Sequence, residues 1–360
     1  MSAASGGEST WSLQSDNDAS FSKLAFEKST SLSVLVPTMR RSNNLSDLKV
    51  DKLRLDSVSL HGRDVETSTL FHAFESLVDK SSEDCHLCLI SGPSGAGKTK
   101  LAETLKESAT RCKGLFVRGK FDLNLRNQPY SGISNACAEI CGTILELQRQ
   151  DPVLAKEITD EIVRSIDIEL SLLVQTIPIL AEIVNMSNVT NPDSLSEVSL
   201  STSDAKNRVN FAFVRFFRVM AYHFFPLIFV LDDLQWADAS SLDLLEVLMA
   251  DHQTHKFMLI GIYRSNEVDE THIFHRCLEE LHSKSLTNTF VMTKLDIHDL
   301  GLEAVNLIIQ DSLQCDDSRT LGLAEVCFKK THGNPFYLIH FLSMLYENQW
   351  LQFNYGTLSW

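Results

Sequence analysis

A glycine-rich turn near residue 90 has the residue types that bind phosphate. Residues 87–103 read LCLISGPSGAGKTKLAE, in which Gly92, Gly97, Lys98 and Thr99 fit the pattern G-x-x-x-x-G-K-S/T. Glycines let successive backbone N–H groups approach a phosphate, and a helix that begins there adds the positive end of its dipole. Lys98 would reach the outer phosphates of a nucleotide, and the Thr99 hydroxyl would ligate Mg²⁺. The turn therefore predicts binding of Mg-ATP. The residues expected to contact the nucleotide here are Gly92, Pro93, Ser94, Gly95, Ala96, Gly97, Lys98, Thr99 and Lys100.

Two adjacent carboxylates follow a second apolar run. Asp232 and Asp233 come directly after residues 227–231, which read LIFVL. Ligands of open α/β sheets bind at the carboxyl ends of the strands, so both acids are expected beside the glycine turn. Asp232 would complete the Mg²⁺ shell with Thr99, and Asp233 would orient or deprotonate an attacking water. A pair of solvated acids after a strand is the alternative interpretation.

A third candidate stands at the end of another apolar run. Arg264 closes the segment FMLIGIYRS, residues 257–265. An arginine at that strand end would point toward the same crevice and could touch the γ-phosphate. A surface arginine beyond the strand is the alternative. Lys98, Asp233 and Arg264 are thus the candidate catalytic residues.

The elements that position these residues follow from apolar periodicity. Apolar runs predict strands at 85–90, 114–121, 227–231, 257–263 and 290–295. Helical spacing predicts helices at 65–78, 98–112, 131–149, 152–185, 208–225 and 241–250. In the helix over 208–225, a stripe of aromatic and apolar side chains is expected in the core: Phe213, Phe216, Phe217, Met220 and Phe224. Alternating strands and helices predict a doubly wound α/β fold, with a parallel central sheet between two helical layers.

The chain divides into three expected parts. Residues 1–52 are rich in Ser, Asn and Asp and are expected to be disordered. Residues 186–204 are expected to form a loop. Residues 53–295 would form the α/β domain, and 296–360 an all-helical subdomain that is truncated. Within that subdomain, Asn334-Pro335-Phe336 should start a helix, because proline is tolerated in the first helical turn. Its packing face is expected to be Phe336, Leu338, Ile339, Phe341, Leu342 and Leu345.

Composition restricts the class of protein. The 360 residues carry a net charge of −15, which argues against coating nucleic acid or an anionic membrane. The first twenty residues lack a signal-peptide pattern, and charged residues interrupt the longest apolar stretch, 211–231, so a cytoplasmic protein is expected. Cys85 and Cys88 form a C-x-x-C, but residues three apart on a strand face opposite sides. Both are therefore expected to be buried rather than to share a metal.

Five segments in order resemble one family. LDDLQWADASSL is similar to the Walker B segment of the origin-recognition-like AAA ATPase modules of STAND proteins, the signal-transduction ATPases with numerous domains. GLFVRGKFDLNLRNQPYSGI resembles the second-strand segment of the members joined to protein kinases, hybrid histidine kinases and nucleotide cyclases. LHGRDVE, IGIYRSNEV and THGNPFYLIHFL resemble the amino-terminal turn, the sensor-one strand and the lid motif. The resemblance implies that Gly62 and Arg63 lie by the adenine, and that Gly333 and Pro335 meet the base or ribose. An ordinary capped helix also explains Pro335.

The resemblance implies a P-loop ATPase that acts as a signalling switch, with protein partners or fused signalling domains. ATP would close the helical lid, and hydrolysis would reopen it. Asp233 stands where many AAA enzymes carry glutamate, and its shorter side chain predicts slow hydrolysis. The alternatives are a DNA-binding replication initiator, a small-molecule P-loop kinase, and an ATP-bound scaffold that scarcely hydrolyses. Acidity and the absence of a basic winged-helix segment before Trp360 disfavour the initiator, so nucleic acid is an unlikely partner.

Overall fold

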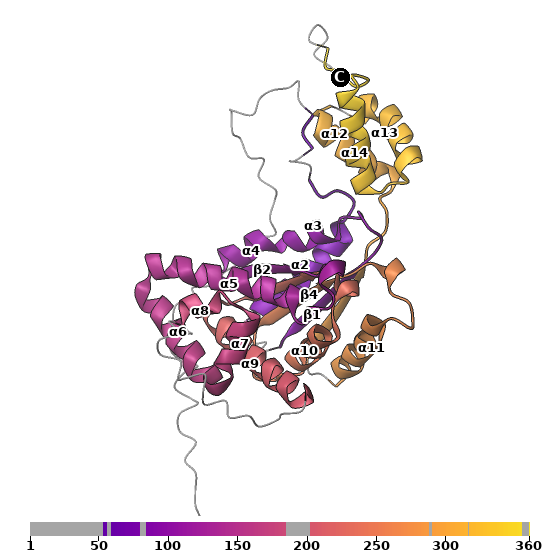
Figure 1. The fold of residues 1–360 in the computed structure, drawn as a ribbon. Helices are drawn as coiled ribbons and strands as arrows, with labels where there is room; N and C mark the ends of the chain where they lie inside the picture. Colours follow the sequence, from indigo (N-terminus) through magenta and orange to yellow (C-terminus); the bar gives the residue numbers. More distant parts are fainter. Residues whose placement is uncertain are drawn as a thin grey trace, which may run out of the picture. The chain divides into compact units, whose positions relative to one another are not determined.

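A parallel sheet of five strands forms the centre of the chain. The computed structural model describes residues 53–55, 59–79, 84–184, 202–287, 290–315, 317–354 and 360. The strand order is β2-β3-β4-β1-β5, and every neighbouring pair is parallel. Figure 1 labels β1, β2 and β4 of this sheet among the surrounding helices. The strands are β1 His86–Ser91, β2 Leu115–Lys120, β3 Leu227–Asp232, β4 Phe257–Ile262 and β5 Val291–Asp296. All five expected strands are therefore confirmed, together with the parallel α/β fold.

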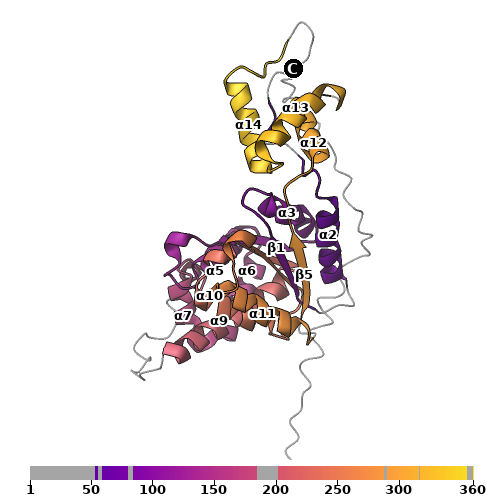
Figure 2. The ribbon, with the colours of Figure 1, turned by 90° about the vertical axis from the view of Figure 1, so that its right-hand side faces the viewer.

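Helices cover both faces of the sheet. One face packs against helices of the middle of the chain: α5 Ser131–Gln150, α6 Pro152–Ile166, α7 Leu170–Thr176, α8 Leu180–Ile183, α9 Thr202–His223, α10 Ala239–Met249 and α11 Ile273–Ser285. The other face packs against α2 Asp64–Val78, α3 Lys98–Glu103 and α4 Leu105–Arg111 (Figure 2). β3 and β4 are buried along their whole length, as expected for strands with helices on both sides.

Successive side chains of β1 and of Cys85 just before it point to opposite faces of the sheet, so they belong to the two hydrophobic cores in turn. Cys85 belongs to the core under α5 to α11, and Cys88 belongs to the core under α2 to α4. Both thiols are buried, and burial raises the pKa of each to about 12. The interpretation of this C-x-x-C as a buried pair on opposite faces is confirmed. The phenylalanine stripe of α9 is also in the core, with Phe213, Phe216 and Phe217 fully buried.

Three helix predictions were wrong in their boundaries. The helix expected over 98–112 is interrupted at Thr104, whose N–H bonds to the carbonyl of Leu101 in a tighter turn. The helix expected over 152–185 is three helices, because Asp167 has a left-handed φ of 51° and Pro178 cannot continue a helical hydrogen-bond ladder. α9 begins at Thr202 rather than at 208, so the end of the expected loop is helical. The rest of that loop and the expected disordered tail lie outside the described residues.

The last three helices enclose a core of their own. These are α12 Leu302–Leu313, α13 Asp317–Thr331 and α14 Pro335–Glu347. Asn334 caps α14 by accepting from the Tyr337 N–H, and Pro335 occupies the first helical position, as predicted. Leu338 and Leu342 are fully buried. Phe336 was wrongly assigned to the packing face, because it is 53% exposed and stacks edge-on against His340 of its own helix.

Within the part of the chain that the structure describes, the helices are too short or too polar for any of them to cross a membrane.

Candidate nucleotide-binding site

The turn between β1 and α3 has a backbone that requires glycine. Gly92, Gly95 and Gly97 have φ angles of 143°, 79° and 95°, which side chains disfavour. A Cβ at Gly92 would come within 2.2 Å of the carbonyl oxygen of Ile297. A Cβ at Gly97 would meet nothing within 4 Å. The turn is thus packed on the side of the residues after β5 and open beside Gly97, where α3 begins.

Lys98 is the first residue of α3, and its side chain folds back along the turn. Its Nζ donates to the carbonyl oxygens of Gly92 at 2.9 Å and Pro93 at 2.7 Å. The residue is 8% exposed. Burial lowers the pKa of Lys98, the nearby Arg264 lowers it further, and Asp232 opposes both effects. A phosphate would supply the negative charge that this buried ammonium favours.

Thr99 and Asp232 bring two oxygen ligands together. The Thr99 hydroxyl donates to Asp232 Oδ2 at 2.8 Å, and the other carboxylate oxygen accepts from the backbone N–H of Asp233 at 2.9 Å. Adjacent ligands of an octahedral Mg²⁺ lie about 2.9 Å apart when each bond is about 2.05 Å. The spacing of these two oxygens therefore fits a magnesium ion. Among the described residues no group of three His, Cys, Asp or Glu side chains could hold a metal.

Asp233 lies at the centre of a set of donors from three strand ends. Its backbone is left-handed, with a φ of 55°, and the residue is 6% exposed. One carboxylate oxygen accepts from Gln235 Nε2 at 2.9 Å and lies 3.3 Å from Arg264 Nε. The other lies 3.2 Å from Lys120 Nζ, at the end of β2. The sequence did not single out Lys120 or Gln235, although both stand in segments used for the family resemblance.

Arg264 reaches the same edge of the sheet, immediately after β4 and Tyr263. Besides Asp233, its guanidinium contacts Glu267 Oε1 at 2.7 Å and lies over the ring of Trp236 at 4.7 Å. Its side chain is 24% exposed. The guanidinium is therefore partly buried among site residues rather than extended into solvent.

Arg63 joins the amino-terminal turn to the glycine turn. The residue is 5% exposed, and Nη2 donates to the Ala96 carbonyl at 3.2 Å and to the His298 carbonyl. Burial lowers the pKa of Arg63, and the adjacent Glu66 opposes this effect. Gly62 next to it has a φ of 66° and packs against Ala304. The structure thus brings Arg63 against the glycine turn, whereas Gly62 lies against Ala304 and Leu300.

The start of α14 also contacts the glycine turn. Asn334 Nδ2 donates to the Ser94 carbonyl and to Asp299 Oδ1, each at 3.0 Å. The Phe336 N–H donates to the Gly95 carbonyl at 3.3 Å. Asn334 was not among the expected site residues, because the motif drew attention to the proline beside it. Pro335 itself is half-buried and starts the helix.

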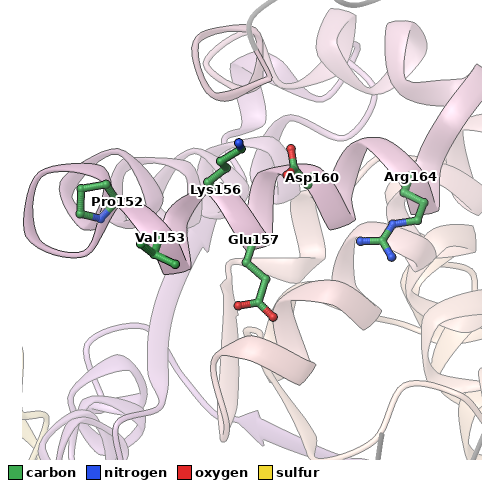
Figure 3. A pocket seen from close by; sticks show the side chains of 6 residues that line it. All are labelled: Pro152, Val153, Lys156, Glu157, Asp160 and Arg164. Carbon is green, nitrogen blue, oxygen red and sulfur yellow. The ribbon is translucent and has the colours of Figure 1, made fainter.

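A hollow of about 540 Å³ lies elsewhere, on α6 (Figure 3). Six side chains of this single helix line it: Pro152, Val153, Lys156, Glu157, Asp160 and Arg164. None of them belongs to the glycine turn, the strand ends or the start of α14. The hollow is the outer face of a charged helix and forms no part of the candidate site.

The parallel sheet, the glycine turn after β1 and the acids at the end of β3 define a P-loop nucleotide-binding fold. Residues 59–260 match the family model described as AAA ATPase domain. The chain therefore belongs to the AAA ATPase family.

Known proteins that are similar to this chain include one relative in sequence and two in structure. Hybrid signal transduction histidine kinase G of Dictyostelium discoideum is 27% identical over 336 residues, which cover 76% of this chain and 9% of that protein. The chain thus spans less than a tenth of that relative. The structure of the Aeropyrum pernix ORC1 protein in complex with DNA is similar with a TM-score of 0.41 and 15% identity, covering 81% of this chain and 62% of that one. A RuvB structure of Thermotoga maritima is similar with a TM-score of 0.38 and 16% identity. The match covers 84% of this chain and 68% of the RuvB chain.

Proposed function

We propose that this chain binds Mg-ATP, hydrolyses it slowly and acts as a STAND-type signalling switch. The observation that carries the proposal is the Thr99 hydroxyl 2.8 Å from Asp232, at the start of a helix preceded by the open glycine turn. A hydroxyl and a carboxylate at this spacing suit a metal ion, and the helix start suits phosphate. Membership of the AAA ATPase family supports nucleotide binding.

Each residue of the turn has a proposed role in binding. The backbone N–H groups of residues 94–100 hold the phosphates, and Lys98 leaves its two carbonyl partners to contact the outer phosphates. Thr99 and Asp232 hold Mg²⁺, which neutralises phosphate charge when it is bound. Gly62, Arg63 and Pro335 lie toward the base and ribose.

Hydrolysis would use Asp233, the residue that follows the proposed metal ligand Asp232. Water attacks the γ-phosphorus, the bond to the ADP oxygen breaks, and Asp233 orients the water or accepts its proton. Arg264 stabilises charge on the γ-phosphoryl oxygens. Asp233 contacts Gln235, Lys120 and Arg264. Its side chain is shorter than that of the glutamate that many AAA enzymes carry at this position, which favours slow turnover.

The switch depends on contacts between the glycine turn and the helical lid. We assign the α/β domain to 53–295 and the lid to 296–360. Asn334 and Phe336 bind the carbonyls of Ser94 and Gly95, so a phosphate that orders the turn would also change these lid contacts. Similarity to part of a hybrid histidine kinase supports a role beside signalling domains or protein partners.

The test uses the unmodified chain. Titration calorimetry with ATP should give binding that requires Mg²⁺ for full affinity, and a phosphate-release assay should give turnover above the rate without protein. Hydrogen exchange over residues 331–345 should differ between the apo, ADP and ATP-analogue states. Absence of ATP binding would contradict the proposed site. Binding without phosphate release would instead indicate a nucleotide-bound scaffold, and identical exchange in all three states would contradict the switch.

A further inference from the structure

Gln235 has the least solvent exposure of the polar residues around Asp233. It is 1% exposed and lies in the short 3₁₀ turn Leu234–Trp236 that follows the paired acids. Its amide bridges two strand ends: Nε2 donates to Asp233 Oδ1 at 2.9 Å, and Oε1 accepts from the backbone N–H of Arg264 at 3.1 Å. We infer that Gln235 is a positioning residue, which fixes the carboxylate of Asp233 relative to Arg264 for hydrolysis. This inference rests on the proposed ATPase activity.

The two partners determine the orientation of the amide. A backbone N–H can only donate, and an ionised carboxylate can only accept. Gln235 must therefore present its oxygen to Arg264 and its nitrogen to Asp233. A residue with one donor and one acceptor at the end of a flexible stem is required here, and glutamine is the side chain of that length that provides both.

The other contacts of Asp233 are less suited to fixing its position. Lys120 reaches the acid with a side chain that is 61% exposed, so water competes with Asp233 for its ammonium. Arg264 divides its guanidinium between Asp233 and Glu267 and also covers Trp236. Gln235 is buried and neutral, so it can hold one oxygen of the carboxylate without cancelling its charge. The backbone it joins is fixed as well, because the Tyr263 N–H bonds to the Ile90 carbonyl at the end of β1.

Two variants of Gln235 distinguish a positioning role from a purely structural one, because the two roles predict different turnover in Gln235→Glu. Gln235→Glu keeps an acceptor for the Arg264 N–H but places an oxygen against Asp233, so it removes the contact with the acid. Gln235→Met has a similar length and removes both contacts. If Gln235 serves only to satisfy the Arg264 backbone, Gln235→Glu should behave like the unmodified chain. If it positions Asp233, both variants should lose turnover.

The experiment measures kcat, KM and the calorimetric Kd for Mg-ATP in the unmodified chain and in both variants. We expect each variant to lower kcat about tenfold or more, because a misplaced catalytic group costs at least that much. KM and Kd should stay within about twofold, because Lys98, Thr99 and Asp232 are untouched. The control is Gln150→Glu, at the exposed end of α5, which adds the same charge and should leave every constant unchanged.

The outcomes separate the inference from the function on which it rests. Turnover by the unmodified chain together with an unchanged kcat in Gln235→Glu would overturn the positioning role and leave the ATPase proposal intact. A parallel rise in KM and Kd would assign Gln235 to nucleotide binding and would also overturn it. No phosphate release by the unmodified chain would refute the proposed hydrolysis, and this inference with it. A variant that binds Mg-ATP with normal Kd is folded, so loss of kcat cannot be attributed to unfolding.

Discussion

Asp232 and Asp233 are neighbours in sequence but differ in their surroundings. Asp232 contacts the Thr99 hydroxyl, whereas Asp233 contacts Gln235, Lys120 and Arg264. The left-handed backbone of Asp233 turns its side chain away from that of Asp232 and toward the ends of β2 and β4. The two acids therefore have different neighbours, because Asp232 lies beside the Thr99 hydroxyl and Asp233 lies among cations.

The variant Asp233→Asn should separate binding from turnover. It keeps an acceptor for Gln235 but loses the charge that orients or deprotonates water, so phosphate release should fall about a hundredfold. The Kd for Mg-ATP should stay within about threefold, because the residues of the glycine turn are unchanged. Calorimetry and a phosphate-release assay check both values. Asp160→Asn, on the exposed face of α6, is the control. Normal phosphate release in Asp233→Asn would show that this acid takes no part in hydrolysis.

His86 has an unusual environment at the start of β1. The side chain is 1% exposed, and neither ring nitrogen has a hydrogen-bond partner among the described residues. Burial lowers the pKa of His86, and Asp84 partly opposes this effect. The folded chain thus binds a proton at this ring less readily than the unfolded chain does. In the unfolded chain a histidine has a pKa of about 6.5. Stability from the neutral ring is fully present above that pH and is lost as the pH falls below it.

We therefore expect the free energy of unfolding to fall between pH 7 and pH 5. One proton contributes at most about 1.4 kcal/mol per pH unit. His86→Leu should reduce this slope by up to that amount, because leucine has no site for the proton and fits an apolar position. Urea unfolding at several pH values measures the slope. His252→Leu, at an exposed position, should leave it unchanged. Equal slopes in the unmodified chain and in His86→Leu would refute a role for this ring.

Among the elements, the first turn of α14 connects the C-terminal helices to the glycine turn. Asn334 caps this helix and also donates to Ser94 and Asp299. Its neighbours fit closely, since a Cβ at Gly95 would lie 2.7 Å from both Asn334 Oδ1 and Phe336 Cβ. Gly333, with a φ of 81°, supplies the turn before the cap and accepts from the Leu300 N–H at 2.9 Å. The start of α14 is therefore in direct contact with the glycine turn.

Asn334→Ala should loosen this helix start. Loss of an N-cap costs about 1 kcal/mol, which corresponds to roughly fivefold more frequent local opening. Amide exchange should accelerate by at least that factor over the first two turns of α14, and the nucleotide-dependent difference there should shrink. Exchange followed by mass spectrometry measures both. Asn348→Ala, which removes a side-chain bond at the other end of the same helix, is the control. Unchanged exchange near residue 336 would contradict the contact between lid and glycine turn.

At the scale of the whole molecule, the site joins segments from residue 63 to residue 336. Arg63, the glycine turn, the ends of β3 and β4, and the start of α14 all contribute contacts. A ligand that binds this arrangement stabilises the folded chain against the unfolded one. The gain is about 2.7 kcal/mol when the free ligand is a hundredfold above its Kd.

Lys98→Ala should remove this stabilisation. Saturating Mg-ATP should raise Tm of the unmodified chain by several degrees and leave Tm of the variant unchanged, because the buried ammonium that meets the phosphates is gone. Without nucleotide the two chains should unfold at similar temperatures. Lys106→Ala, at an exposed position in α4, should respond to Mg-ATP as the unmodified chain does. An equal rise of Tm in Lys98→Ala would rule out the glycine turn as the nucleotide site.

The sequence by itself predicted the five strands, the glycine turn after the first strand and the start of the last helix. Apolar runs predicted all five strands. The signal is strongest in β3 and β4, because a strand buried on both faces leaves little room for polar residues. The spacing of Gly92, Gly97, Lys98 and Thr99 predicted the phosphate turn, because its contacts lie within eight residues. The same local logic placed Pro335 at the start of a helix.

Tertiary structure alone decided which strand ends meet. The order β2-β3-β4-β1-β5 brings Lys120 and Arg264 to Asp233 from opposite sides. Lys120 and Asp233 are more than a hundred residues apart in the sequence. It also gave Gln235 two partners and brought Asn334 to the glycine turn. No local pattern encodes such contacts, because they depend on the packing of segments distant in the chain. For the same reason Phe336 looked like a core residue in sequence, yet it lies exposed beside the turn.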